Sequence, residues 1–347
     1  MTTNRRYLIV FLALSAALIG SLWVAQKVVV QQYFNSGMSN DDYLANLRDS
    51  DHFGCSTFEF RPPGLMFVGD SASYTAWDYN LIQRRLPNRS IAACTIGGFM
   101  ARTLDLLVDN FEQSGFRPKV IVLGLTPFFF LDDMPWQLIH QKRLLESDWP
   151  RIHARKIALQ LLVPGAYPKS HAAFEDAFRR HRSDIEAIGE EKLRDLLLPR
   201  FNSPPTDSWA PLDRTGKSFA AIRRFCEFSR RNGIPLYVIV IPFADLWWEP
   251  RPDSDRQAYR RAVNSFKGCA ERVVSRPMAD YGLGNRHFLN SVMSFRNDRF
   301  DYAQWDRDPD AVRAGFGPTH INLVGARRFT PLALRFLGII PPNDGDR

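Results

Sequence analysis

The 347-residue sequence contains only four cysteines, and none of them lies in a Cys-x-x-Cys motif. Their small number excludes a disulfide-dense scaffold, and the lack of histidines nearby at ligand spacing argues against zinc. We therefore expect neither a metal nor a cofactor. Internal repeats and low-complexity stretches are also absent. The chain has one long apolar run and a mean hydropathy of −0.25, which excludes a membrane protein with many spanning helices.

The sequence also lacks a region in which positive charge is clustered. The net charge of +8 comes from 45 Lys and Arg against 37 Asp and Glu, which are interleaved along the chain. Basic clusters such as Arg179-Arg180-His181-Arg182 are typical of solvated helix faces. The sequence has no zinc-finger spacing, no aromatic–basic recognition signature and no long basic tail, so we expect no nucleic-acid partner.

The single apolar run lies at the N-terminus. Residues 7–25 carry no charge, and their length nearly matches the roughly 30 Å hydrocarbon core of a bilayer. Arg5 and Arg6 precede the run, which favours a cytoplasmic N-terminus and export of the remaining chain. We predict a transmembrane anchor within residues 1–30 of a bacterial inner-membrane protein whose body lies in the periplasm. A cleaved signal peptide is the alternative, although no clear small-x-small cleavage site ends the run.

An extracytoplasmic location allows disulfides to persist. The sequence predicts the pairs Cys55–Cys94 and Cys226–Cys269, because each pair joins neighbouring predicted elements. Four buried free thiols are the alternative.

Short apolar runs bounded by glycine or proline predict strands that are buried on both faces. The predicted strands cover residues 64–69, 90–96, 119–125 and 235–241. Stretches with apolar residues at helical spacing cover residues 77–86, 99–114, 217–232, 254–274 and 322–337. This alternation predicts an α/β fold with a three-layer, doubly wound, mainly parallel sheet over residues 55–340.

Other segments interrupt the alternation. Residues 135–205 are rich in Arg, His, Leu and Ala, and they predict a helical insertion between the third and fourth strands. Residues 243–253 and 280–317 are predicted to be loops.

Two polar residues, Ser71 and His320, lie next to predicted elements at positions where parallel sheets bind ligands. Ser71 follows the first strand in Gly69-Asp70-Ser71, where its hydroxyl is exposed and its amide is free to donate to an oxyanion. An ordinary helix-capping turn is the alternative for this tripeptide. His320 precedes the last helix, and from there a neutral imidazole can reach Ser71 and accept its proton.

Three features of the sequence resemble the SGNH (GDSL) hydrolase superfamily. They are the Ser71 turn, Gly97-Gly98 after the second strand, and the Thr-His-Ile-Asn-Leu-Val-Gly-Ala run around His320. The resemblance covers about residues 55–130 and 215–340. It is greatest with membrane-anchored, exported members that act on cell-surface polymers, such as the alginate O-acetylation proteins and the D-alanylation protein DltD. It implies that Ser71 is the nucleophile and that His320 is the general base and then the acid. It also implies an oxyanion hole formed by the amides of Ser71 and of Gly97 or Gly98.

The sequence departs from this family in two places. The family usually has an aspartate three residues before its histidine, where this chain has Gly317. Asp306, Asp308 and Asp310 are the candidates for the missing acid, and we take Asp308. The family's third strand usually ends at an oxyanion-hole asparagine, whereas Thr126 stands here and would donate its hydroxyl instead.

Three functions are compatible with these residues. The first is an exported acyltransferase or acylesterase that modifies a cell-surface polysaccharide or related polymer. The resemblance implies a multi-pass membrane acyltransferase as its partner, and Trp247 and Trp248 either stack on sugar rings or pack as loop anchors. The second is a simple exported esterase. The third is a non-catalytic polymer-binding or assembly protein, which the missing aspartate and asparagine favour.

Overall fold

The computed structural model describes residues 15, 64–89, 91–95, 99–115, 117–130, 170–202, 216–289, 312 and 316–342. Several predictions fall outside these ranges. They concern the N-terminal anchor, the first part of the helical insertion, Cys55, the glycine pair Gly97 and Gly98, and the candidate acids Asp306, Asp308 and Asp310. Within the described ranges, none of the helices has the length and apolar character needed to cross a bilayer.

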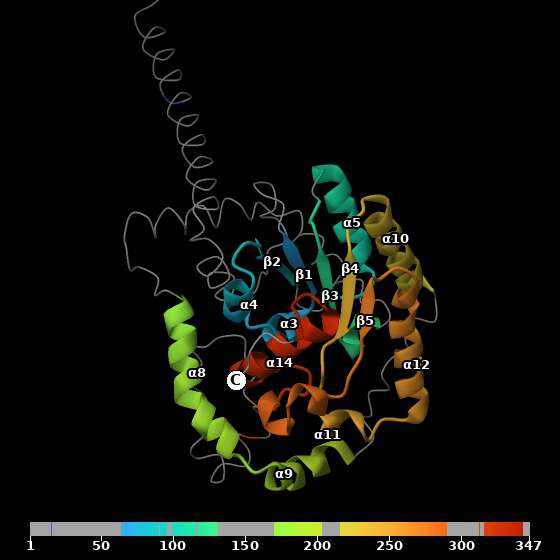
Figure 1. Cartoon of the computed structure of the whole chain (residues 1–347). Helices are drawn as coiled ribbons and strands as arrows, with labels where there is room; N and C mark the ends of the chain where they lie inside the picture. The colour runs from blue at the N-terminus through green and yellow to red at the C-terminus, as the bar shows by residue number, and fades with distance from the viewer. Residues whose placement is uncertain are drawn as a thin grey trace, which may run out of the picture.

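A five-stranded sheet lies at the centre of the molecule, and all of its strand pairs are parallel (Figure 1). The strand order is β2-β1-β3-β4-β5. The strands are β1 (Leu65–Gly69), β2 (Ile91–Thr95), β3 (Ile121–Leu125), β4 (Leu236–Val240) and β5 (Arg272–Val274). Every residue of β1, β2 and β3 is buried, as expected of strands that are covered on both faces.

Helices cover both faces of the sheet (Figure 1). Successive residues of β1 point to opposite faces, so Phe67 packs on Trp77 in one core cluster and Val68 packs in the other. The first layer contains α3 (Ser71–Ala76), α4 (Tyr79–Arg85) and α14 (Leu323–Leu337), and the second contains α5 (Thr103–Ser114), α10 (Lys217–Arg231) and α12 (Asp253–Asn264). The structure therefore confirms an α/β fold with a parallel sheet between two helical layers.

Some predicted elements differ from the observed ones. The helix expected over residues 254–274 is wrong at its C-terminal part, where α12 is followed by the 3-10 helix η3 (Ser265–Gly268) and by β5. Gly268 ends the helical region, and the β-branched pair Val273-Val274 favours a strand. The helix expected over residues 77–86 is observed as α4, whereas α3, which precedes it and begins at Ser71, was not predicted.

The predicted loops also contain short helices. The segment 243–253 includes α11 (Asp245–Trp248), and the described part of 280–317 includes the 3-10 helix η5 (Asn285–Phe288). Another 3-10 helix, η4 (Met278–Tyr281), overlaps the beginning of that part. Between β3 and β4, η2 (Pro127–Phe130), α8 (Ser170–Ala187) and α9 (Glu190–Asn202) follow one another, so the described part of the insertion is helical as predicted.

The predicted disulfide between Cys226 and Cys269 is present and joins α10 to the residue that follows η3. Cys94 on β2 is also disulfide-bonded, whereas Cys55, its expected partner, lies outside the described residues. Cys94, Cys226 and Cys269, the cysteines in the described ranges, are all disulfide-bonded, so the alternative of four free thiols is wrong. Disulfides are compatible with an extracytoplasmic location.

Candidate active site

The fold brings together Ser71 and His320, which are 249 residues apart in the sequence. The Oγ of Ser71 lies 2.9 Å from the Nε2 of His320. Ser71 is the first residue of α3 and follows β1, while His320 lies in the turn before α14, and the two helices pack against each other (Figure 1). This distance lies within hydrogen-bonding range, as a serine nucleophile and its general base would require.

Two glycines allow α3 to begin directly against the sheet. A Cβ atom on Gly69 would lie 2.5 Å from the Cβ of Ser73, and one on Gly124 would lie 2.9 Å from the same atom. Both distances are too short for non-bonded carbon atoms, so any side chain at either position would displace α3. The amide of Ser71 comes first in this helix, and an amide at that position has no acceptor within the helix.

Asp70 is buried beneath the candidate site, and its carboxylate is held by three donors. Its Oδ1 accepts a hydrogen bond from the amide of Ser73 at 2.9 Å, which caps α3. The hydroxyl of Thr126 donates to Oδ2 at 2.5 Å, and the amide of Ala72 also donates to the carboxylate. Burial raises the pKa of Asp70, while the hydrogen bonds and the nearby His320 oppose that rise. We expected the hydroxyl of Thr126 to donate to an oxyanion, but in this arrangement it donates to Asp70.

The other ring nitrogen of His320, Nδ1, lies 3.2 Å from the hydroxyl oxygen of the buried Thr319. When Ser71 donates to Nε2, Nδ1 carries the proton and donates to Thr319. Burial lowers the pKa of His320 below its ordinary 6.5, while the charge of Asp70 opposes that shift. A neutral imidazole with a free lone pair on Nε2 is the form that a general base requires.

The third member of the expected triad is not described, because Asp308 lies outside the described residues. The same holds for Gly97 and Gly98 of the expected oxyanion hole. Within the described part, Thr319 contacts Nδ1 of His320, and Asp70 is the carboxylate whose charge acts on the imidazole. Sequence reasoning missed Thr319, and its position directly before His320 was the only signal that pointed to it. Among the described residues, no group of three metal-ligating side chains is found.

An aromatic cluster lies on η2 and α11, which follow the carboxyl ends of β3 and β4. Phe128 is 37% exposed, and its ring centroid lies 6.1 Å from that of Trp247. Trp247 is buried, stacks on Trp248 and lies under the guanidinium of Arg251. The two tryptophans therefore have a packing role, and the exposed ring next to the β3 end is that of Phe128.

The buried side chain of His287 on η5 predicts how the stability of the protein depends on pH. The side chain is 1% exposed, and burial, together with the charges of Arg328 and Arg286, lowers its pKa from 6.5 to about 4. Between these pH values the unfolded chain binds a proton that the folded protein does not, so stability falls as the pH decreases. We expect His287 to account for a loss of up to about 3 kcal/mol over this interval.

The variant His287→Asn should show a shallower loss of stability between pH 6.5 and 4, because asparagine does not titrate. Its amide oxygen replaces Nδ1, which accepts a hydrogen bond from the Gly284 amide at 2.8 Å. Urea unfolding of both proteins at several pH values measures the difference, and other titrating groups contribute equally to both. Parallel pH profiles would show that His287 is not the buried neutral group described.

Comparison with known proteins found no matching family model and no matching curated protein. The resemblance to the SGNH superfamily therefore stays a prediction, which depends on the sequence motifs.

Proposed function

We propose that this protein is an exported, membrane-anchored serine acyltransferase or acylesterase of the SGNH type, which modifies a cell-surface or exopolysaccharide-type polymer. The observation that supports this proposal most directly is the 2.9 Å contact between Ser71 Oγ and His320 Nε2. The contact lies at the carboxyl edge of a parallel sheet, which is where such sheets bind their ligands.

The proposed reaction has two halves. In the first, Ser71 Oγ attacks the carbonyl carbon of an acyl donor while its proton passes to Nε2 of His320. The Ser71 amide stabilises the negative oxygen, with the amide of Gly97 or Gly98 as the expected second donor. The imidazolium then protonates the leaving group, and acyl-Ser71 remains. In the second half, an acceptor hydroxyl gives its proton to His320 and attacks the acyl carbon. The bond between that carbon and Ser71 Oγ then breaks, and the imidazolium returns the proton to Oγ, which regenerates Ser71 and the neutral imidazole.

The polymer substrate is proposed from the compartment and the resemblance. The uncharged run at residues 7–25 would hold the site at the periplasmic face of the inner membrane, and the disulfide between Cys226 and Cys269 is compatible with that location. A multi-pass membrane acyltransferase would supply the acyl group. The exposed ring of Phe128 follows β3, which pairs in parallel with β1, so it offers an apolar surface at the same edge of the sheet as Ser71 for part of a substrate.

Incubation of the full-length protein in detergent with an activated acetyl ester tests the proposal. We expect the intact mass to increase by one acetyl group and the increase to vanish in Ser71→Ala. The matched control is Ser73→Ala, which removes a buried serine hydroxyl from the same helix and should be acetylated like the wild type. An adduct that persists in Ser71→Ala, or equal behaviour of the two variants, would contradict the proposal.

A non-catalytic polymer-binding role is the second candidate. It is favoured by the neutral Thr319 hydroxyl, because the described group that contacts Nδ1 of His320 is not a carboxylate. Absence of any adduct in the wild type would support this role. Rapid loss of the adduct to water, without transfer to a sugar hydroxyl, would instead favour a simple esterase.

A further inference from the structure

The turn that presents His320 is held on both sides by η5. Before the histidine, the amide of Gly317 donates to the carbonyl of Phe288 at 3.0 Å. After it, the amide of Asn322 donates to the carbonyl of His287 at 2.8 Å. A shift of η5 would therefore move the backbone on both sides of His320.

The side chain of Asn322 strengthens this connection. Its Nδ2 donates to the carbonyls of Arg286 and Leu289, both at 3.0 Å, so it holds η5 and the residue that follows it. Its Oδ1 accepts from the amide of Gly325 at 3.0 Å and thereby caps α14. Asn322 is 3% exposed, so water does not compete for these hydrogen bonds. The position of η5 thus fixes the beginning of α14 and the turn before it.

η5 is in turn held by the helical insertion. The carboxylate of Glu190, the first residue of α9, accepts hydrogen bonds from the amides of Asn285 at 2.9 Å and Arg286 at 3.2 Å. The side chain of Arg286 donates to the carbonyls of Glu186 and Ile188 at the end of α8. All four hydrogen bonds run from donors in η5 to acceptors at the junction between α8 and α9.

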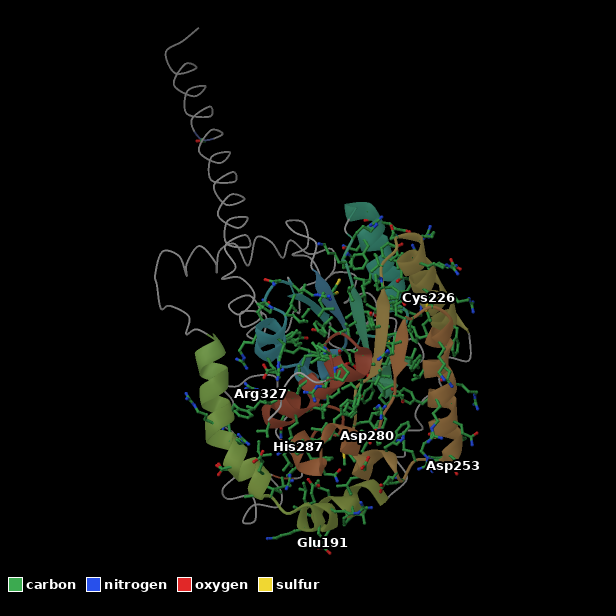
Figure 2. The ribbon with its side chains drawn as sticks, viewed as in Figure 1. Glu191, Cys226, Asp253, Asp280, His287 and Arg327 are labelled. Atoms are coloured by element: carbon green, nitrogen blue, oxygen red, sulfur yellow. A yellow bond between two sulfur atoms is a disulfide. The ribbon has the colours of Figure 1, made fainter. Side chains whose placement is uncertain are left out.

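The close approach of the two segments depends on a glycine. A Cβ atom on Gly284 would lie 2.6 Å from the carboxyl carbon of Glu190, so no other residue fits there without displacing the glutamate. Figure 2 shows Glu191, the neighbour of Glu190, at the outer edge of the molecule and His287 of η5 further inside, toward α14. Through its contacts with Glu190 and with Asn322, η5 connects the insertion to the His320 turn.

A second contact of α9 is weaker. Arg194 pairs with Glu249 next to α11 at 3.0 Å, and the amide of Ala244 before α11 donates to the carbonyl of Pro318 in the His320 turn at 2.8 Å. However, the side chains of Arg194 and Glu249 are 46% and 54% exposed, and exposed ion pairs contribute little. The hydrogen bonds from the η5 amides to Glu190 are thus the stronger connection.

We propose that Glu190 is a positioning residue for His320, through which the α8–α9 insertion holds the imidazole against Ser71. The catalytic consequence of this role rests on the proposed function, whereas the structural consequence does not. Each carboxylate oxygen accepts from one amide: Oε2 from Asn285 and Oε1 from Arg286. A glutamine has only one acceptor oxygen, and its NH2 group would face the second amide. The isosteric change Glu190→Gln therefore removes one hydrogen bond, together with the ion pair between Glu190 Oε1 and Arg286 Nε at 3.5 Å, and leaves the volume unchanged.

The experiment compares the full-length wild type, Glu190→Gln and the matched control Glu191→Gln. Both glutamates lie in the first turn of α9, so both variants lose the same favourable charge at the helix N-terminus. Glu191 is exposed, and its substitution should change nothing at the site. Glu190 has a side chain that is 35% exposed, so its substitution leaves the core intact, which thermal unfolding verifies.

Two readouts are measured on each protein. The first is the rate of Ser71 acetylation by an activated ester, which we expect to fall by about ten- to a hundredfold in Glu190→Gln only. The second is the titration of each histidine ring by NMR with 13C-labelled histidine, in which the variant His320→Gln assigns the His320 signal. We expect the pKa of His320 to rise toward 6.5 in Glu190→Gln, because a displaced imidazole gains water.

The His287 ring reports on η5 itself, since its pKa of about 4 depends on its burial there. A change of the His287 titration without a change at His320 would show that Glu190 holds only η5, and the proposal would be wrong. Unchanged titration of both rings would also overturn it. If the wild type is not acetylated, the proposed function fails, and the His320 titration still decides whether Glu190 positions the imidazole.

Discussion

Replacing His320 with glutamine is expected to slow acetylation of Ser71 by about 10²- to 10⁴-fold, because the variant loses its general base. The Nε2 atom of His320 lies 2.9 Å from Ser71 Oγ and is the only described group placed to take its proton. Glutamine occupies a similar volume but has no basic nitrogen. The initial rate of adduct formation, followed by intact mass, measures the effect.

The dependence of the rate on pH distinguishes the loss of a base from a disturbed structure. Burial places the pKa of His320 below 6.5, so the wild type keeps a neutral imidazole at pH 7 and loses it only as the pH falls through that lower pKa. The wild-type rate should therefore decrease on acidification, and the decrease should be absent in His320→Gln. His181→Gln on α8 serves as the control histidine, with the wild-type rate and profile. A wild-type rate in His320→Gln would remove His320 from the mechanism.

The sheet was largely predictable because its strands are buried on both faces. Such strands appear in the sequence as continuous apolar runs that end at glycine or proline, and the four predicted runs contain β1 to β4. β5 was not predicted, since it has only three residues and begins with the exposed Arg272. Hydrogen bonds to β4 stabilise β5, and this pairing cannot be recognised from so short a sequence.

The candidate site was predictable only in part, because sequence motifs locate residues at strand ends but do not show which side chains meet. Ser71 and His320 were predicted from their positions, and the fold places them in contact. The role of Thr319 depends on the direction of one hydroxyl, which no pattern shows. Glu190 looks in the sequence like an ordinary acid at a helix N-terminus, and only its contacts with η5 reveal another role.

Gly124→Ala is expected to destabilise the protein by about 1–3 kcal/mol, because the added methyl group has no space. The new Cβ would lie 2.9 Å from the Cβ of Ser73 and 3.3 Å from the Cδ1 of Ile241, and both partners belong to the packed interior. Ser73 is only two residues after Ser71, so relief of the clash must move the helix that carries the nucleophile. We therefore expect slower acetylation together with the lower stability, measured by urea unfolding and by intact mass.

Two variants isolate the cause. Gly268→Ala in η3 makes the same substitution where no atom lies within 4 Å of the new Cβ, and it should leave stability and acetylation unchanged. Ser73→Gly removes the atoms that Gly124→Ala would meet, so Gly124→Ala should cost less in the Ser73→Gly background than in the wild type. Equal costs in the two backgrounds would mean that α3 does not press on β3. Ser71 would then lack the support from the sheet that keeps its Oγ within hydrogen-bonding distance of His320.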